Sequence, residues 1–161
     1  GQDVVVIGGG NAAFETAAQL LAYCKSVTLI HRSENFRADE ITVEKVRRNS
    51  KLKIITNAEL LEFRGAKFVK SLSYKDAKTG EIRELATTGV FVEIGLIPST
   101  NLVKDLVKLT DYGAVIVDPR TQASSLAGIW AAGDCTDGLY HQNNIAAGDA
   151  VKALENIYER R

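Results

Sequence analysis

The chain has 161 residues, of which 45% are apolar and 25% charged, and it contains two prolines. This composition predicts a folded globular protein with little disorder. The 20 acidic and 20 basic side chains cancel, so no net charge favours nucleic acid or an anionic membrane. No apolar run reaches the roughly 18 residues of a membrane span and no leader peptide is recognisable, so we expect a cytoplasmic protein.

The opening of the chain predicts a βαβ unit. Asp3 to Ile7 and Val27 to Ile30 are apolar runs rich in β-branched residues, which are typical of parallel strands buried on both faces. Between them, apolar side chains recur at helical spacing and define one buried helix face: Ala13, Ala17, Leu20, Leu21 and Cys24.

Further elements extend this unit into a Rossmann-like α/β fold with a doubly wound parallel sheet. Residues 39–49 predict a second helix, and residues 53–56 predict a third short strand. Residues 90–94 are again apolar and predict a return to the parallel sheet. Gly95 and Pro98 follow them, so we place a domain boundary near Gly95.

The segment between these strands predicts an antiparallel β-meander that covers the parallel sheet. Phe68, Leu72 and Tyr74 share one alternating face, and a Thr79-Gly80 turn separates this run from a strand over 82–87. Tyr74 and Lys78 also have the spacing of the short-chain dehydrogenase pair. That class of enzyme is excluded, because its pair must lie on a helix whereas this one leads into a turn.

Beyond residue 95 we expect a helix around 102–109, strands at 114–117 and 128–132, and a final helix. Val115 and Ile129 lie in the two strands, and apolar edges and faces near them should be exposed unless another chain covers them, so we expect a homodimer or a domain swap. The buried face of the final helix is predicted from apolar spacing: Ala147, Ala150, Val151, Leu154 and Tyr158.

The first strand ends in a turn with the spacing Gly-x-Gly-x-x-Ala, formed by Gly8, Gly9, Gly10, Asn11, Ala12 and Ala13. Gly8 permits the tight turn, Gly10 lets a pyrophosphate approach the backbone, and Ala13 allows close packing of helix on strand. The amino terminus of the helix then faces the anion. A glycine turn in this βαβ context predicts a dinucleotide site.

Basic residues after the second strand favour NADPH over NADH. An acidic residue would bind the adenosine ribose of NADH there, but the chain has His31 and Arg32, with Arg37 shortly after. Arginine forms charge-assisted hydrogen bonds with phosphate, each stabilising by about 1.5 to 3 kcal/mol. We therefore predict that Arg32 and Arg37 surround the 2′-phosphate of NADPH.

In these motifs, and in Gly133-Asp134 near its end, the chain resembles the low-molecular-weight thioredoxin reductases, and the resemblance runs from end to end. The segments Phe91 to Pro98 and Ala131 to Cys135 also resemble the flavoprotein of alkyl hydroperoxide reductase. One departure from the family pattern is Ser33, where the family often has a second arginine.

The resemblance implies an NADPH-binding domain over residues 1–95 and the C-terminal portion of an FAD-binding domain over residues 96–161. It implies that Gly133 and Asp134 contact the flavin ribityl–pyrophosphate region, and that His141, Gln142 and Asn143 begin a helix near the isoalloxazine. Further residues are assigned to cofactor binding: Glu15, Ser33, Ile94 and Gly95.

The function implied by the resemblance is hydride transfer from NADPH to FAD and then to a disulfide, in a thioredoxin-like or peroxiredoxin-system protein. The sequence contains no second Gly-x-Gly-x-x-Gly turn and no Cys-x-x-Cys pair. We therefore expect no turnover from this chain alone, no catalytic residue or metal site within it, and a structural role for Cys24. The alternative is a non-catalytic NADPH-binding module that pairs with a separate flavin and dithiol chain.

Overall fold

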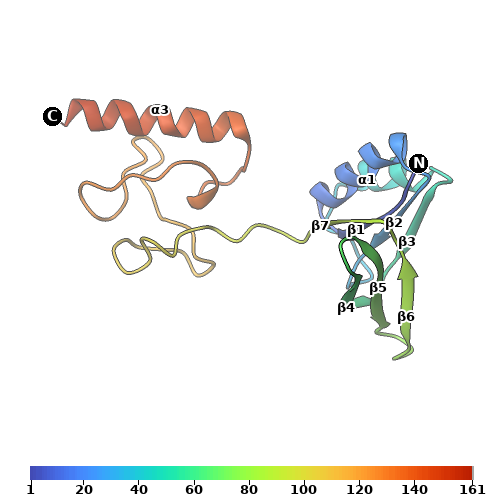
Figure 1. Cartoon of the computed structure of the whole chain (residues 1–161). Helices are drawn as coiled ribbons and strands as arrows, with labels where there is room; N and C mark the ends of the chain where they lie inside the picture. The colour runs from blue at the N-terminus through green and yellow to red at the C-terminus, as the bar shows by residue number, and fades with distance from the viewer. Residues whose placement is uncertain (161) are drawn as a thin grey trace. The chain divides into compact units, whose positions relative to one another are not determined.

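The computed structural model describes residues 1–160, which form two compact units. The first unit comprises Gly1–Gly95 and the second begins at Leu96. Regular strands are confined to the first unit, while the second contains the long helix α3 (Asn143–Glu159) and the short 3-10 helix η1 (Gly133–Cys135) (Figure 1).

A four-stranded parallel sheet forms the centre of the first unit, with the order β3-β2-β1-β7. Its strands are β1 (Asp3–Gly8), β2 (Ser26–Ile30), β3 (Leu52–Ile55) and β7 (Gly89–Glu93). β7 follows the others by a long connection yet pairs directly with β1, in the register Gly8↔Glu93. The carboxyl ends of β2, β1 and β7 therefore lie side by side at one edge of the sheet.

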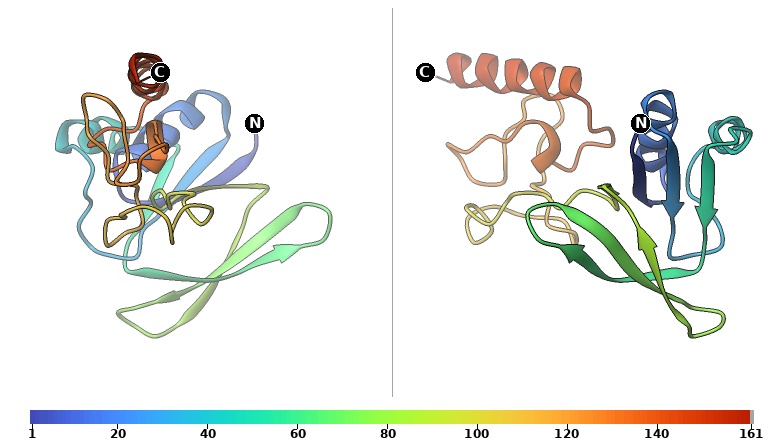
Figure 2. Two further views of the ribbon diagram at one scale, coloured as in Figure 1. Left: turned by 90° about the vertical axis from the view of Figure 1, so that its left-hand side faces the viewer. Right: turned by 45° about the vertical axis from the view of Figure 1, so that its right-hand side comes forward.

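The two faces of this sheet are covered by different kinds of structure. Val4 and Val6 pack against α1 (Asn11–Tyr23) and α2 (Glu40–Arg47). Val5 and Ile7 point to the other face and pack against the antiparallel sheet, whose order is β4-β5-β6. The strands of that sheet are β4 (Ala58–Gly65), β5 (Val69–Asp76) and β6 (Ile82–Ala86), drawn in green in Figure 2.

The predicted α/β fold class, with its meander over the parallel sheet, is confirmed. Leu72 and Tyr74 are buried as predicted, and so is Cys24 at the end of α1. The prediction for Phe68 is wrong, because this residue lies in the turn between β4 and β5 and is 73% exposed. Alternation could not locate the start of β5, since the hairpin turn before it interrupts the pattern.

The helix predicted around residues 102–109 is absent, and turns occupy this segment. The amides of Val103 and Leu106 each donate a hydrogen bond to the carbonyl three residues earlier, as in a turn. Within residues 102–109, only Val107 is buried. A helix this short is marginal unless tertiary packing stabilises it. Leu102 and Leu106 are exposed, so that packing is missing here.

The strands predicted at 114–117 and 128–132 are reduced to isolated bridges, Leu109↔Val115, Val115↔Thr136 and Ala123↔Trp130. A strand requires neighbours along its length to form a ladder, and the described residues supply only single-residue pairings. Val115 is buried rather than exposed, so the expectation of an apolar edge at this residue is wrong. Ile129 is half-buried.

Helix α3 forms as predicted but buries the opposite face. Its buried residues are Asp149 and Ala153, whereas Val151, Leu154 and Tyr158 are 57%, 62% and 72% exposed. Ala147 and Ala150 are also exposed. The side of the helix that faces the unit also makes polar contacts, since Asp149 and Asn156 both accept hydrogen bonds from the rest of the unit. Within residues 1–160, no helix is long and apolar enough to cross a membrane.

Candidate functional site

The glycine turn between β1 and α1 is shaped by close contacts on one side and open space on the other. Gly8 has a φ of +154°, and a Cβ there would collide with the carbonyl oxygen of Glu93 and lie 2.8 Å from Cβ of Ala13. A Cβ at Gly10 would meet no atom within 4 Å. The turn therefore packs tightly against β7 and α1, while its surface at Gly10 is open.

The amino terminus of α1 is well suited to hold an anion. Gly10 is its N-cap and provides no side-chain cap, and the first turn contains no acidic residue. The first intrahelical hydrogen bond into this end runs from the Phe14 amide to the Gly10 carbonyl. The amides of Asn11, Ala12 and Ala13 precede it, so they can donate to a ligand.

The loop after β2 folds back onto the glycine turn. The Gly9 carbonyl accepts hydrogen bonds from the amides of Arg37 (2.8 Å) and Ala38 (3.2 Å). The Asn11 side-chain oxygen accepts a third, from the Asp39 amide, at 2.8 Å. Residues far apart in the sequence are thereby fixed next to one another, and Arg37 is attached to the turn through its backbone.

His31 covers the outer side of Gly9. A Cβ on Gly9 would collide with the imidazole ring, so the two residues are in close contact. The ring contacts the Asn35 carbonyl through Nε2 at 3.2 Å, and its centroid lies 5.4 Å from that of Phe36. Phe36 packs edge-on against the buried Phe14 of α1 at 4.9 Å. An aromatic cluster thus fixes the loop that carries the basic residues.

The basic residues of this loop are accessible. Arg32, Ser33 and Arg37 are exposed, and neither arginine forms an ion pair among residues 1–160. Glu34, the carboxylate nearest to Arg32 in the sequence, is paired with Lys78 of the meander at 3.1 Å. The guanidinium groups therefore remain available to an anionic ligand.

The carboxyl end of β7 forms the other side of the turn. Ile94 is 75% exposed and Gly95 has a φ of +119°. Glu93 lies opposite Gly8, and one of its carboxylate oxygens accepts a hydrogen bond from the Thr16 hydroxyl of α1 at 3.0 Å. Glu15, the neighbour of Thr16, is exposed.

Thr16 and Glu93 lie outside the glycine motif and the basic loop, so neither motif indicates them. The available signal was the single acidic residue inside the apolar run Val90 to Ile94. A charged side chain in a strand of a parallel sheet requires a partner, and Thr16 provides one.

The second unit brings together the residues predicted around Gly133. Gly133 has a φ of +76°, and a Cβ there would lie 2.9 Å from Cβ of Ala146 in α3. Asp134 follows it in η1, and its Oδ1 lies 3.7 Å from Nδ1 of His141. Gln142 is the N-cap of α3 and makes no side-chain cap, and Asn143 begins the helix. The free amino terminus of α3 therefore lies close to the glycine and aspartate.

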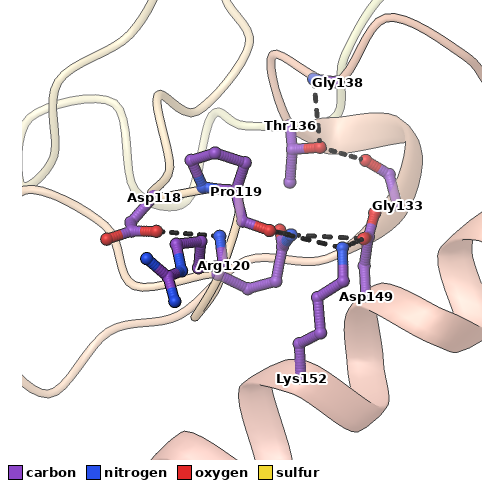
Figure 3. A network of polar contacts seen from close by, with 9 residues as sticks. Asp118, Pro119, Arg120, Gly133, Thr136, Gly138, Asp149 and Lys152 are labelled. Atoms are coloured by element: carbon purple, nitrogen blue, oxygen red, sulfur yellow. Dashed lines mark hydrogen bonds and ion pairs between the residues drawn. The ribbon is translucent and has the colours of Figure 1, made fainter.

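A partly buried polar network attaches α3 to the rest of this unit (Figure 3). Gln122, which is 3% exposed and has a φ of +59°, donates through Nε2 to Asp149 (3.2 Å) and to the Pro119 carbonyl (3.4 Å). Lys152 donates to the same two acceptors, at 3.0 and 3.3 Å. Thr136 donates to the Gly133 carbonyl at 2.7 Å and so fixes the turn that precedes it.

Two further observations concern possible metal ligands and the cysteines of the described residues. No group of three or more His, Cys, Asp or Glu side chains within residues 1–160 is arranged to hold a metal ion. Both cysteines are free, with Cys24 buried and Cys135 half-buried, its Sγ 3.5 Å from the Ala132 carbonyl.

Comparison with known proteins gives similarity along nearly the whole chain. Residues 1–150 match the family described as pyridine nucleotide-disulphide oxidoreductase. A thioredoxin reductase of Mycolicibacterium smegmatis is 45% identical over 94% of this chain and 49% of its own length. An alkyl hydroperoxide reductase component of Xanthomonas campestris pv. phaseoli is 39% identical over 99% of this chain and 30% of its own length.

A solved structure agrees with these sequence relatives. The thioredoxin reductase of Lactococcus lactis, in its FR conformation, superposes with a TM-score of 0.83 at 34% identity, covering 98% of this chain and 52% of that one. The chain thus spans about half the length of the thioredoxin reductases that it matches.

Proposed function

The chain belongs to the pyridine nucleotide-disulphide oxidoreductase family, and we propose that its residues 1–95 bind NADPH at the electron-donor end of a flavin-dependent disulfide reductase. One observation carries this proposal. The Gly9 carbonyl accepts hydrogen bonds from the amides of Arg37 and Ala38, so the glycine turn and the basic loop form a single site.

The pyrophosphate of NADPH would lie against Gly10. The open surface at this residue lets a phosphate reach the backbone, and the amides of Asn11, Ala12 and Ala13 can donate to it. Gly8 and Ala13 set the close packing below the turn. These features fit a dinucleotide, because a side chain at Gly10 would fill the space that the phosphate needs.

The 2′-phosphate would lie between Arg32 and Arg37. Arg32 follows the carboxyl end of β2, where the adenosine ribose lies in folds of this type. Arg37 lies further along the same loop and is hydrogen-bonded through its amide to Gly9, and both arginines are exposed. Glu34 does not compete for them, since it is paired with Lys78. Ser33 adds a hydroxyl but no charge.

The second unit is proposed to supply part of an FAD site, through Gly133, Asp134 and the amino terminus of α3 at His141, Gln142 and Asn143. FAD, when bound, provides the chemistry that accepts a hydride and passes electrons to a disulfide. The residues of this unit would bind it, and the helix terminus favours partial negative charge on a reduced ring.

For the whole protein we propose that the electron acceptor is a thioredoxin-like or peroxiredoxin-system disulfide protein. Similarity to proteins named thioredoxin reductase and alkyl hydroperoxide reductase supports this class. A cytoplasmic location suits such a reaction, because thiols are kept reduced there.

The test is the double variant Arg32→Ala with Arg37→Ala. We expect it to weaken NADPH binding by about a hundredfold and NADH binding by less than about threefold, since only NADPH carries the 2′-phosphate. Isothermal titration calorimetry measures both dissociation constants. The control is Arg48→Ala, which removes an exposed arginine at the carboxyl end of α2. Equal weakening of both nucleotides by the double variant would show that the arginines do not read the 2′-phosphate.

A further inference from the structure

Glu93 is a carboxylate at the edge of the dinucleotide site, and neither the glycine motif nor the basic loop explains its presence. It is the last residue of β7 and pairs with Gly8, the first glycine of the turn. Its side chain is directed toward α1, where Thr16 donates a hydrogen bond to Oε1 at 3.0 Å. Both residues are half-buried.

The order of the strands indicates which part of the cofactor reaches Glu93. A dinucleotide lies across the carboxyl ends of the strands, with its pyrophosphate at the glycine turn after β1. The adenosine half extends over β2, toward His31 and Arg32. The nicotinamide half must then extend to the opposite side of β1, and the strand on that side is β7.

Thr16 leaves half of the carboxylate available. The hydroxyl occupies Oε1, and no described residue in 1–160 donates a hydrogen bond to Oε2. The bond restricts the rotation of the Glu93 side chain and thereby presents Oε2 at a fixed place. A preorganised acceptor binds a donor more tightly than a mobile one, because less conformational entropy is lost on binding.

Resting on the proposed NADPH site, we propose that Glu93 is a specificity-determining residue that accepts a hydrogen bond from the carboxamide N–H of the nicotinamide, with Thr16 as its positioning residue. The carboxamide carries two N–H donors, which require acceptors when the ring is shielded from water. A carboxylate oxygen is a strong acceptor for an amide N–H, since such bonds are charge-assisted.

The experiment compares three probes by isothermal titration calorimetry: NADPH, its reduced 3-acetylpyridine analogue, and adenosine 2′,5′-bisphosphate. The analogue replaces the carboxamide NH2 by a methyl group, and the bisphosphate lacks the nicotinamide half altogether. We expect Glu93→Ala to weaken NADPH binding about tenfold and to leave both other probes within about twofold. The control Glu155→Ala removes an equal charge from an exposed position on α3 and should change none of them.

Thr16→Val tests the positioning role while keeping the carboxylate. It should weaken NADPH binding about threefold and spare the other two probes, with the melting temperature recorded for every variant. If Glu93→Ala does not fold, Thr16→Val still decides the matter through the same pattern.

Two results would overturn the inference. In the first, the affinity for NADPH is unchanged in both variants. In the second, all three probes bind more weakly by the same factor, which would mean that the hydrogen bond between Thr16 and Glu93 only holds α1 against β7. Failure of the proposed function would give a different result from failure of this inference, because the unaltered chain would then bind neither NADPH nor the bisphosphate.

Discussion

Gly8, Gly9 and Gly10 are consecutive, yet each meets a different environment. Added methyl groups would collide with the Glu93 carbonyl at Gly8 and with the His31 ring at Gly9, whereas one at Gly10 would meet nothing within 4 Å. Gly8 is therefore required by the backbone packing of the fold, and a side chain at Gly9 would have to displace the His31 ring. Gly10 is required only by a ligand that approaches the backbone. A substitution at Gly10 should therefore affect ligand binding without affecting folding.

Gly10→Ala should leave the protein folded and remove its affinity for NADPH. The backbone at this position has φ −98° and ψ −176°, which alanine adopts without strain. We expect a change in melting temperature below about 2 °C, together with a loss of NADPH affinity of at least about tenfold. Circular dichroism and calorimetric titration measure the two quantities. Gly9→Ala is the contrasting variant, expected to lower both. Unchanged affinity in Gly10→Ala would place the pyrophosphate elsewhere.

At the scale of elements, single side chains decide how a turn or helix is held. The Asp76 carboxylate accepts hydrogen bonds from the amides of Lys78 (2.9 Å) and Thr79 (3.1 Å), and Gly80 completes the turn between β5 and β6 with a φ of +76°. These backbone bonds, with Arg83 nearby, lower the pKa of Asp76 below its ordinary value. The turn therefore depends on an ionised carboxylate.

Asp76→Asn should lower stability at neutral pH but not in acid. Because the folded pKa of Asp76 is lowered, its contribution is present above the ordinary pKa of about 4 and is lost as the pH falls through the folded value. Melting temperatures between pH 2.5 and 7 should thus converge for the two proteins at low pH. Asp111→Asn is the control, since no described hydrogen bond involves that exposed side chain. A difference that is constant with pH would contradict the charge mechanism.

At the scale of the molecule, every residue of the proposed NADPH site lies in the first unit, Gly1–Gly95. This unit has its own layers and its own core on both faces of the parallel sheet. The second unit depends instead on one helix, isolated bridges and the polar network around Gln122. We therefore expect the first unit to be better able than the second to fold on its own.

A protein limited to residues 1–95 should fold and bind NADPH with a dissociation constant within about twofold of that of the whole chain. Calorimetry on both proteins, with circular dichroism to establish folding, provides the comparison. A folded fragment with much weaker binding would assign part of the site to the second unit.

Self-association is the second prediction at this scale. The side chains of Val151, Leu154 and Tyr158 expose an apolar stripe on α3, and such stripes favour contact with another surface. We expect a dimer of the whole chain by sedimentation velocity, and a monomer for Val151→Glu with Leu154→Glu. Glu159→Lys, which reverses an exposed charge on the same helix outside the stripe, is the matched variant that should still dimerise. A monomeric unaltered chain would disprove the idea.

The sequence by itself determined the βαβ unit, the meander and the return of β7 to the parallel sheet. Those elements are governed by local rules, since strand alternation, helical spacing and turn glycines act within a few residues. The glycine turn and its proposed nucleotide followed from the same local patterns around Gly8 and His31.

Only the tertiary structure decided features that depend on long-range partners. Residues 102–109 and 114–117 have suitable patterns but lack the packing or ladder partners that stabilise a helix or strand. Helix α3 buries Asp149 rather than Leu154, and Asp149 accepts a hydrogen bond from Gln122, a residue 27 positions away. The contact of Thr16 with Glu93 joins residues 77 positions apart, so no local pattern could reveal it.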